Sequence, residues 1–132
     1  MEYFNIAIDG PAGAGKSTIA KLAAEKLGFV YVDTGAMYRS MALYFIRQGI
    51  SPEDEEAIAR ACSQVEVTIR YADGVQQVIL NGEDVSGLIR SEEVGRMASA
   101  TSVYRPVRKK LVQLQKQLAR EADVIMDGRD IG

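Results

Sequence analysis

The chain has 132 residues, of which 47% are hydrophobic and 26% are charged, and this is enough for one globular domain with its own core. Its formal net charge of −2 gives no overall attraction to nucleic acid or to an anionic membrane, so we expect neither as a partner. One cysteine, Cys62, excludes an internal disulfide, and the lack of histidine excludes His-based triads and His-ligated metals. We expect a cytoplasmic protein, because a lone thiol suits a reducing compartment and the sequence shows neither a signal peptide nor an apolar run of membrane-spanning length.

The first predicted element is a short buried strand over residues 4–9, and a glycine-rich loop follows it. The loop fits G-x-x-x-x-G-K-[ST], the phosphate-binding loop of nucleoside triphosphatases. Its glycines let backbone N–H groups surround an anion, Lys16 supplies a charge for the β- and γ-phosphates, and the Ser17 hydroxyl supplies a Mg²⁺ ligand. Apolar residues at helical spacing predict a helix behind the loop that ends at Gly28. The loop residues are Gly10, Pro11, Ala12, Gly13, Ala14, Gly15, Lys16, Ser17 and Thr18.

A second strand is predicted over residues 29–32, and a helix over residues 36–48 then ends at Gly49. Ser51 would cap a third helix that runs to about residue 63 and has Pro52 in its first turn. Cys62 belongs to the apolar pattern of this helix, which predicts a buried thiol.

The middle of the chain changes to the alternating pattern of half-exposed strands. Strands are predicted over residues 65–71, 75–80 and 83–85, with tight turns between them, one of them at Asn81-Gly82. This small antiparallel meander is typical of an insertion into a fold that otherwise alternates strands and helices.

The last third of the chain returns to that alternation. Ser91 would cap a helix, and Pro106 stands near the start of a long basic helix whose charges we interpret mostly as a solvated face. A buried strand over residues 124–127 ends the series. The sequence therefore predicts an α/β fold with a parallel sheet core and a small antiparallel insertion.

Acids and arginines follow the predicted strands of the parallel sheet, where ligands of open α/β sheets bind. Asp33 and Asp127 are candidates to hold Mg²⁺ or its waters, and Arg39 and Arg129 suit a second phosphate group. If the acceptor is a phosphate monoester, it is mostly dianionic at pH 7 and needs no histidine base. Catalysis then consists of positioning and charge neutralisation.

Six runs in chain order resemble bacterial cytidylate kinase, a P-loop nucleoside monophosphate kinase. They are IDGPAGAGKST (residues 8–18), VDTGAMYR (32–39), NGEDVS (81–86), IR (89–90), VR (107–108) and DGRDIG (127–132). The resemblance implies transfer of the γ-phosphoryl group of ATP to CMP or dCMP with Mg²⁺. It also implies a core sheet whose third strand lies between the first two, and a meander that belongs to the monophosphate-binding insertion.

The resemblance assigns roles residue by residue. The loop of residues 10–18 would bind the ATP phosphates. The residue types and their positions, apart from the resemblance, make Lys16, Arg39, Arg129 and Asp127 the catalytic candidates and Ser17, Asp33 and Asp127 the metal candidates. The CMP site would be lined by Thr34, Tyr38, Arg39, Ser99, Arg108, Arg129 and Asp130, of which Ser99, Arg108 and Asp130 would read the cytosine.

The chain departs from the family pattern in length, since the last core strands, the lid arginines and the adenine site of the family do not appear in it. We expect a first part of the P-loop core over residues 1–64, a monophosphate-binding insertion over 65–103 and a return to the core over 104–132. We also expect these 132 residues alone to have little kinase activity and to self-associate through an unpaired edge of the first strand. The longer enzyme would be a monomer.

Three other interpretations stay open. The chain could belong to another small-molecule P-loop kinase, or it could be a nucleotide-binding switch or sensor without catalysis. The second is less well supported, because no N-K-x-D run for guanine is present and the two arginines after the strands would have no use. A third is a truncated product kept for self-association.

Overall fold

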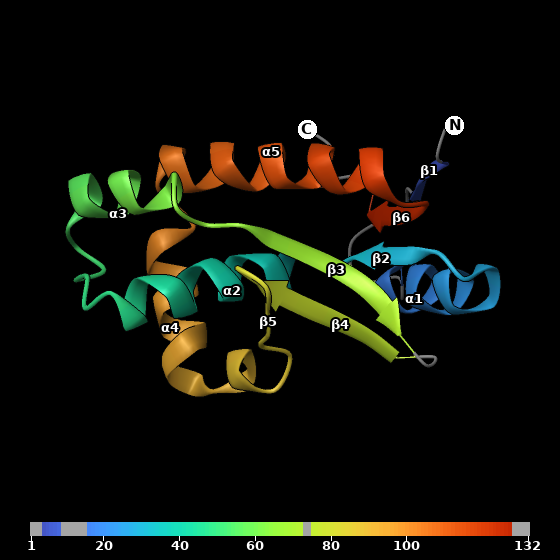
Figure 1. The fold of residues 1–132 in the computed structure, drawn as a ribbon, viewed down its shortest axis with the longest axis horizontal. Helices are drawn as coiled ribbons and strands as arrows, with labels where there is room; N and C mark the ends of the chain where they lie inside the picture. Colours follow the sequence, from blue (N-terminus) through green and yellow to red (C-terminus); the bar gives the residue numbers. More distant parts are fainter. Residues whose placement is uncertain (1–3, 9–15, 73–74, 128–132) are drawn as a thin grey trace.

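The computed structural model describes residues 4–8, 16–72 and 75–127 (Figure 1). Strands β1 (Asn5–Ile8), β2 (Val30–Val32) and β6 (Val124–Asp127) form a parallel sheet in the order β1-β6-β2. In its register Ile8 pairs with Asp127 and Val32 pairs with Met126, so the three strands end at the same edge of the sheet. The predicted parallel core, with its third strand between the first two, is therefore confirmed.

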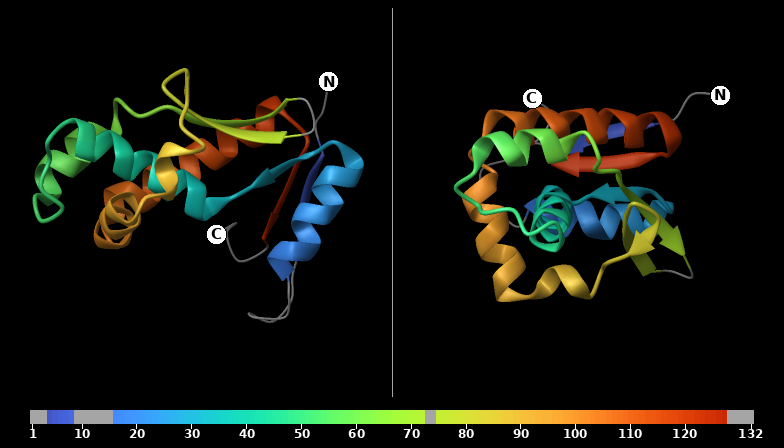
Figure 2. Two further views of the ribbon diagram at one scale, coloured as in Figure 1. Left: turned by 90° about the horizontal axis from the view of Figure 1, so that it is seen from below. Right: turned by 60° about the vertical axis from the view of Figure 1, so that its left-hand side comes forward.

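Helix α1 (Lys16–Leu27) lies along one face of this sheet, as the left view of Figure 2 shows. Ala20 and Ala24 of the helix form a small buried cluster with Tyr31 and Ile125 of the strands. Their small side chains allow the helix to approach the strands closely. The helix ends before Gly28, whose φ of +71° is the left-handed conformation that glycine adopts without a Cβ clash, so the predicted stop is confirmed.

Helix α2 (Thr34–Arg47) starts directly after β2 and buries one side completely. Met37, Met41 and Phe45 are among its residues with no exposed surface. The start of α2 is two residues earlier than predicted, because the side chain of Asp33 caps it.

Helix α3 (Glu55–Cys62) starts later than the sequence predicts, and the prediction that Ser51 caps it is wrong. The N-cap is Asp54, whose Oδ1 accepts a hydrogen bond of 3.1 Å from Ala57 N. The Ser51 hydroxyl instead accepts from Glu53 N at 3.2 Å, within a turn that precedes the helix. Both residue types are good caps, but Asp54 is the one followed directly by two acidic residues in the first turn, Glu55 and Glu56.

A second, antiparallel sheet contains β3 (Val67–Ala72), β4 (Val75–Leu80) and β5 (Glu83–Asp84), in that order. The turn from β4 to β5 has φ values of 49° at Asn81 and 86° at Gly82, as the predicted asparagine–glycine turn requires. Strand β3 starts two residues later than predicted and β5 ends one residue earlier. The meander itself is confirmed.

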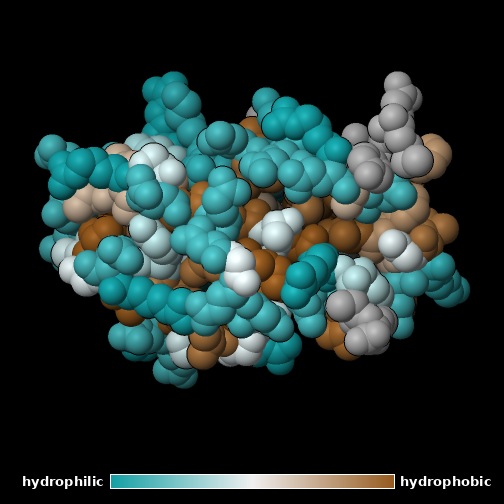
Figure 3. Space-filling view, in the orientation of Figure 1, coloured by the Kyte–Doolittle hydropathy of each residue, from teal (hydrophilic) through white to brown (hydrophobic). Residues whose placement is uncertain are grey.

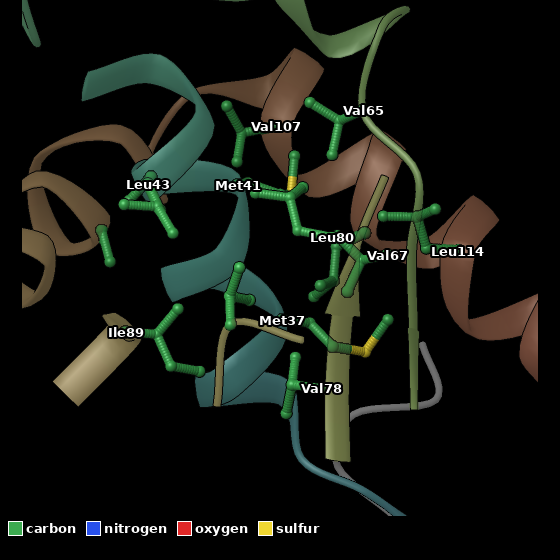
Figure 4. Packing of buried hydrophobic residues seen from close by; sticks show 14 of the residues in the cluster. Met37, Met41, Leu43, Val65, Val67, Val78, Leu80, Ile89, Val107 and Leu114 are labelled. Carbon is green, nitrogen blue, oxygen red and sulfur yellow. The ribbon is translucent and has the colours of Figure 1, made fainter. Parts of the chain in front are cut away.

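The chain then forms a short 3-10 helix, η1 (Leu88–Arg90), which was not predicted, followed by α4 (Glu92–Thr101) and α5 (Arg105–Glu121). Ser91 caps α4, as predicted, by accepting from Val94 N at 3.2 Å. One continuous buried cluster joins α2, α3, both sheets, α4 and α5. Figure 4 shows part of it, with Met37 and Met41 of α2 among side chains of β3, β4 and α5 such as Val67, Leu80 and Leu114. Within the described ranges, no helix is long and apolar enough to cross a membrane.

Cys62 lies in this cluster and is 6% exposed, which confirms the prediction of a buried thiol. Burial raises the pKa of the thiol, and the charge of Lys110 offsets this only in part, so little reactive thiolate is present at neutral pH. We expect thiol reagents at pH 8 to modify Cys62 at least about tenfold more slowly in the folded chain than in denaturant. Equal rates in the two states, followed by mass spectrometry, would contradict a buried thiol.

Candidate functional site

The ends of the three parallel strands define where the predicted site should lie. Lys16, Ser17 and Thr18, the last three residues of the predicted phosphate loop, form the first turn of α1, and Asp127 is the last residue of β6. The backbone of these four residues is described, but their side chains are not. The other predicted residues of this group lie outside the described residues: Gly10, Pro11, Ala12, Gly13, Ala14, Gly15, Arg129 and Asp130.

Asp33 and Thr34 stand where β2 passes into α2. Asp33 Oδ1 accepts a hydrogen bond of 3.1 Å from Ala36 N and so caps the helix. Thr34 Oγ1 accepts from Gln115 Nε2 of α5 at 3.4 Å, which ties the start of α2 to a second helix. Both residues are half-buried at the sheet edge where β1 and β6 also end.

Arg39 lies one turn further along α2 and is held from two sides. One terminal nitrogen, Nη1, donates a hydrogen bond of 2.8 Å to the carbonyl oxygen of Ile89 in η1. The other, Nη2, lies against Gly95 of α4, only 3.0 Å from where a Cβ of that residue would stand. Because glycine has no side chain, the guanidinium group rests directly on the α4 backbone. Tyr38, the preceding residue, is half-buried against the main hydrophobic cluster.

Two open clefts meet at Arg39. The first has a volume of about 520 Å³ and lies between α1, the end of β2, the start of α2 and the antiparallel sheet. Asp33 and Arg39 line it, together with Arg90 of η1 and Lys21 of α1. The second has a volume of about 670 Å³ and lies between α2 and α4. It brings Arg39 together with Ser99, two residues that the sequence predicted to share a substrate site.

Arg108 does not line either of these clefts. It lies on α5 in a separate open groove of about 570 Å³ together with Arg105, Lys109, Lys116 and Arg120. The upper rim of the face in Figure 3, over α5, is accordingly mostly hydrophilic. The predicted contact of Arg108 with the same ligand as Ser99 therefore stays a prediction.

Gln76 of β4 is a residue of the first cleft that the sequence did not single out. Its Nε2 donates to the carbonyl oxygen of Tyr31 at 2.8 Å, and its Oε1 accepts from Tyr31 N at 2.9 Å. One amide side chain thus pairs with the edge of β2 that faces away from β6, in the manner of a neighbouring strand, and joins the two sheets. Across the described part of the chain, three or more Asp, Glu or Cys residues do not gather into a metal-binding group.

A match to a known protein family shows to which family the chain belongs. The family model described as cytidylate kinase matches residues 6–132. The chain belongs to the cytidylate kinase family. Its fold is that of the P-loop nucleoside monophosphate kinases, here with a parallel sheet and a small antiparallel sheet.

Curated cytidylate kinases are similar along the whole chain. It is 52% identical over 132 residues to the cytidylate kinase of Caldicellulosiruptor bescii and 51% identical over 132 residues to that of Leuconostoc mesenteroides. It is 46% identical over 127 residues to that of Geobacter sulfurreducens. These matches cover 100%, 100% and 96% of this chain, but only 58%, 59% and 54% of the respective relatives. The chain thus spans somewhat more than half the length of the curated cytidylate kinases that it matches.

Proposed function

We propose that the protein transfers the γ-phosphoryl group of ATP to CMP or dCMP and so forms CDP or dCDP. The observation that carries this proposal is the cytidylate kinase match along residues 6–132. The geometry agrees with it, because β1, β2 and β6 end at one edge and Arg39 stands beside that edge between two open clefts. Such an edge is where α/β sheets of this kind bind their ligands.

The reaction needs little covalent chemistry from the protein. A phosphate oxygen of the acceptor forms a bond to the γ-phosphorus, and the bond from that phosphorus to the β–γ bridging oxygen breaks, so ADP leaves. In our proposal the N–H groups of residues 10–18 and the Lys16 ammonium hold the ATP phosphates. Arg39 and Arg129 hold the acceptor phosphate and neutralise charge, which keeps the two substrates aligned.

Ser17, Asp33 and Asp127 are the proposed ligands of Mg²⁺ or of its waters. Asp33 fits this role in its observed position, because only its Oδ1 is used in capping α2 and a carboxylate has further acceptor capacity. When bound, the ion supplies charge neutralisation at the phosphates. The cap also fixes the direction of the Asp33 side chain at the sheet edge.

We propose that Ser99, Arg108 and Asp130 recognise the cytosine base of the acceptor. Thr34 and Tyr38 would line the part of the site that binds its ribose and phosphate. A carboxylate can accept from the cytosine N4 amine, and Arg and Ser can meet its O2 and N3 acceptors. Residues 65–103 would form the monophosphate-binding insertion between core segments 1–64 and 104–132. Arg108 would reach the base from its own helix.

We also propose that the enzyme is cytoplasmic and monomeric, and that residues 1–132 alone self-associate. Among the strands described, β1 pairs only with β6, so its second edge presents unpaired backbone groups.

Kinase assays of the complete gene product with ATP and Mg²⁺ test the function. We expect CMP and dCMP to be phosphorylated with a kcat/KM at least about tenfold above that for UMP and AMP, since a site that pairs with the cytosine amine rejects bases without its pattern. AMP or UMP as an equal acceptor would overturn the assignment to CMP. Residues 1–132 alone should show little turnover.

A further inference from the structure

We propose that Arg96 of α4 is a second binding residue for the phosphate end of the acceptor, beside Arg39. This inference rests on the proposed function and adds a residue to the same site. It starts from the cleft between α2 and α4, which Arg39, Arg96 and Ser99 line together. Arg96 and Ser99 are three residues apart on α4 and therefore lie on one side of that helix.

The guanidinium group of Arg39 contacts the α4 backbone one residue before Arg96, so the two arginines line the cleft from its α2 and α4 sides. The Nη2 atom of Arg39 rests against Gly95, which directly precedes Arg96 in the chain. Arg39 is held there by the hydrogen bond of 2.8 Å to Ile89. An anion bound beside Gly95 would therefore have one fixed guanidinium on the α2 side and a second, more exposed one on the α4 side.

Arg96 is free to turn toward such an anion at small cost. Among the described residues it forms one ion pair, of 3.6 Å with Glu92 one helical turn away, and the two side chains are 73% and 94% exposed. Exposed pairs of this kind contribute little to stability. A phosphate group offers stronger, charge-assisted hydrogen bonds, and it can accept two of them from one guanidinium group.

Glu92 is the acid among the residues that line this cleft. It competes with the acceptor phosphate for Arg96 and also repels that phosphate. The two members of the pair should therefore act in opposite directions on acceptor binding, which a merely structural ion pair would not do. This difference in sign is the basis of the test.

The test compares Arg96→Ala, Glu92→Gln and a matched control, Arg60→Ala, in the complete gene product. Arg60 forms the same kind of exposed pair on α3, with Glu56 at 3.0 Å, and does not line the three grooves described above. We expect Arg96→Ala to raise the KM for CMP about three- to tenfold at low salt with kcat nearly unchanged. We expect Glu92→Gln to lower that KM and Arg60→Ala to leave it as it is.

Added salt should reduce the difference between Arg96→Ala and the wild type, because screening weakens an exposed charge contact. An unchanged KM for CMP in Arg96→Ala, or a KM that rises equally in Arg96→Ala and Glu92→Gln, would overturn the inference while CMP phosphorylation by the wild type still supports the function. A wild type that does not phosphorylate CMP would overturn the proposed function instead.

Discussion

Replacing Gln76 with leucine should lower the free energy of unfolding by about 1–3 kcal/mol, because two partly buried backbone groups lose their partner at once. The Gln76 amide pairs with both the N–H and the carbonyl group of Tyr31, at 2.9 and 2.8 Å. Tyr31 is only 8% exposed and both bonds are partly buried at the wall of the first cleft, so water can replace them only in part. Leucine has a similar size but no polar atoms, and the cost therefore reflects the unsatisfied groups rather than a cavity. Urea unfolding followed by circular dichroism gives the value.

The neighbouring residue of the same strand provides the control. Gln77 points to the other face of β4, where its Oε1 accepts from Arg70 Nε at 3.0 Å in an exposed pair. Gln77→Leu should cost less than about 1 kcal/mol, since water can take the place of the lost bond. If the two variants were equally stable, the join between the sheets would not contribute in the way we infer.

Replacing Arg39 with alanine should reduce kcat/KM for CMP about 10- to 150-fold, the effect of removing a charged hydrogen-bond donor worth about 1.5–3 kcal/mol. The KM for ATP should change little, because the proposed ATP contacts come from residues 10–18. Arg39→Lys should be intermediate, since lysine keeps the charge but cannot grip two phosphate oxygens at once. Steady-state kinetics with each substrate varied in turn measures all three values.

The variant Arg47→Ala, near the end of the same helix, is the control that distinguishes a loss of the Arg39 contact from a loss of helix stability. Arg47 makes two hydrogen bonds to Glu83, at 2.7 and 3.1 Å, and these bonds lower the pKa of the Glu83 carboxyl group. Arg47→Ala removes an exposed ion pair far along α2 from the sheet edge and should leave the kinetics unchanged. An equal kinetic loss in Arg47→Ala and Arg39→Ala would mean that α2 as a whole, rather than the Arg39 contact, carries the effect.

Features set by a few neighbouring residues were predictable from the sequence. The left-handed Gly28, the Asn81-Gly82 turn and the Ser91 cap each depend on local backbone chemistry, and each is found where it was predicted. The local signal is ambiguous where two candidates compete, since Ser51 and Asp54 are both good caps and the structure uses Asp54, the one that two acidic residues follow directly.

The candidate site was predictable only as far as the strand order allows. Strands that end at one edge bring Asp33 and the backbone of Asp127 to one side, and the shared cleft of Arg39 and Ser99 follows from the packing of α4 on α2. The pairing of Gln76 with Tyr31 joins residues 45 positions apart and has no local sequence signal. The same holds for Arg39 resting on Gly95, because a glycine within a helix does not indicate what packs against it.

The position of β6 in the middle of the parallel sheet has a consequence for how the chain is made. Both β1 and β2 hydrogen-bond to β6, and the contact of Phe4 with Asp123 joins residues 119 positions apart. During synthesis on the ribosome, β1 and β2 therefore cannot pair into the sheet until β6 has emerged, whereas the β3–β4–β5 hairpins can form from residues that have already emerged. Contacts of such long range slow folding. Until β6 emerges, the nascent chain would thus contain a formed meander and two strands, β1 and β2, without their common partner. A chaperone would be most useful during this interval.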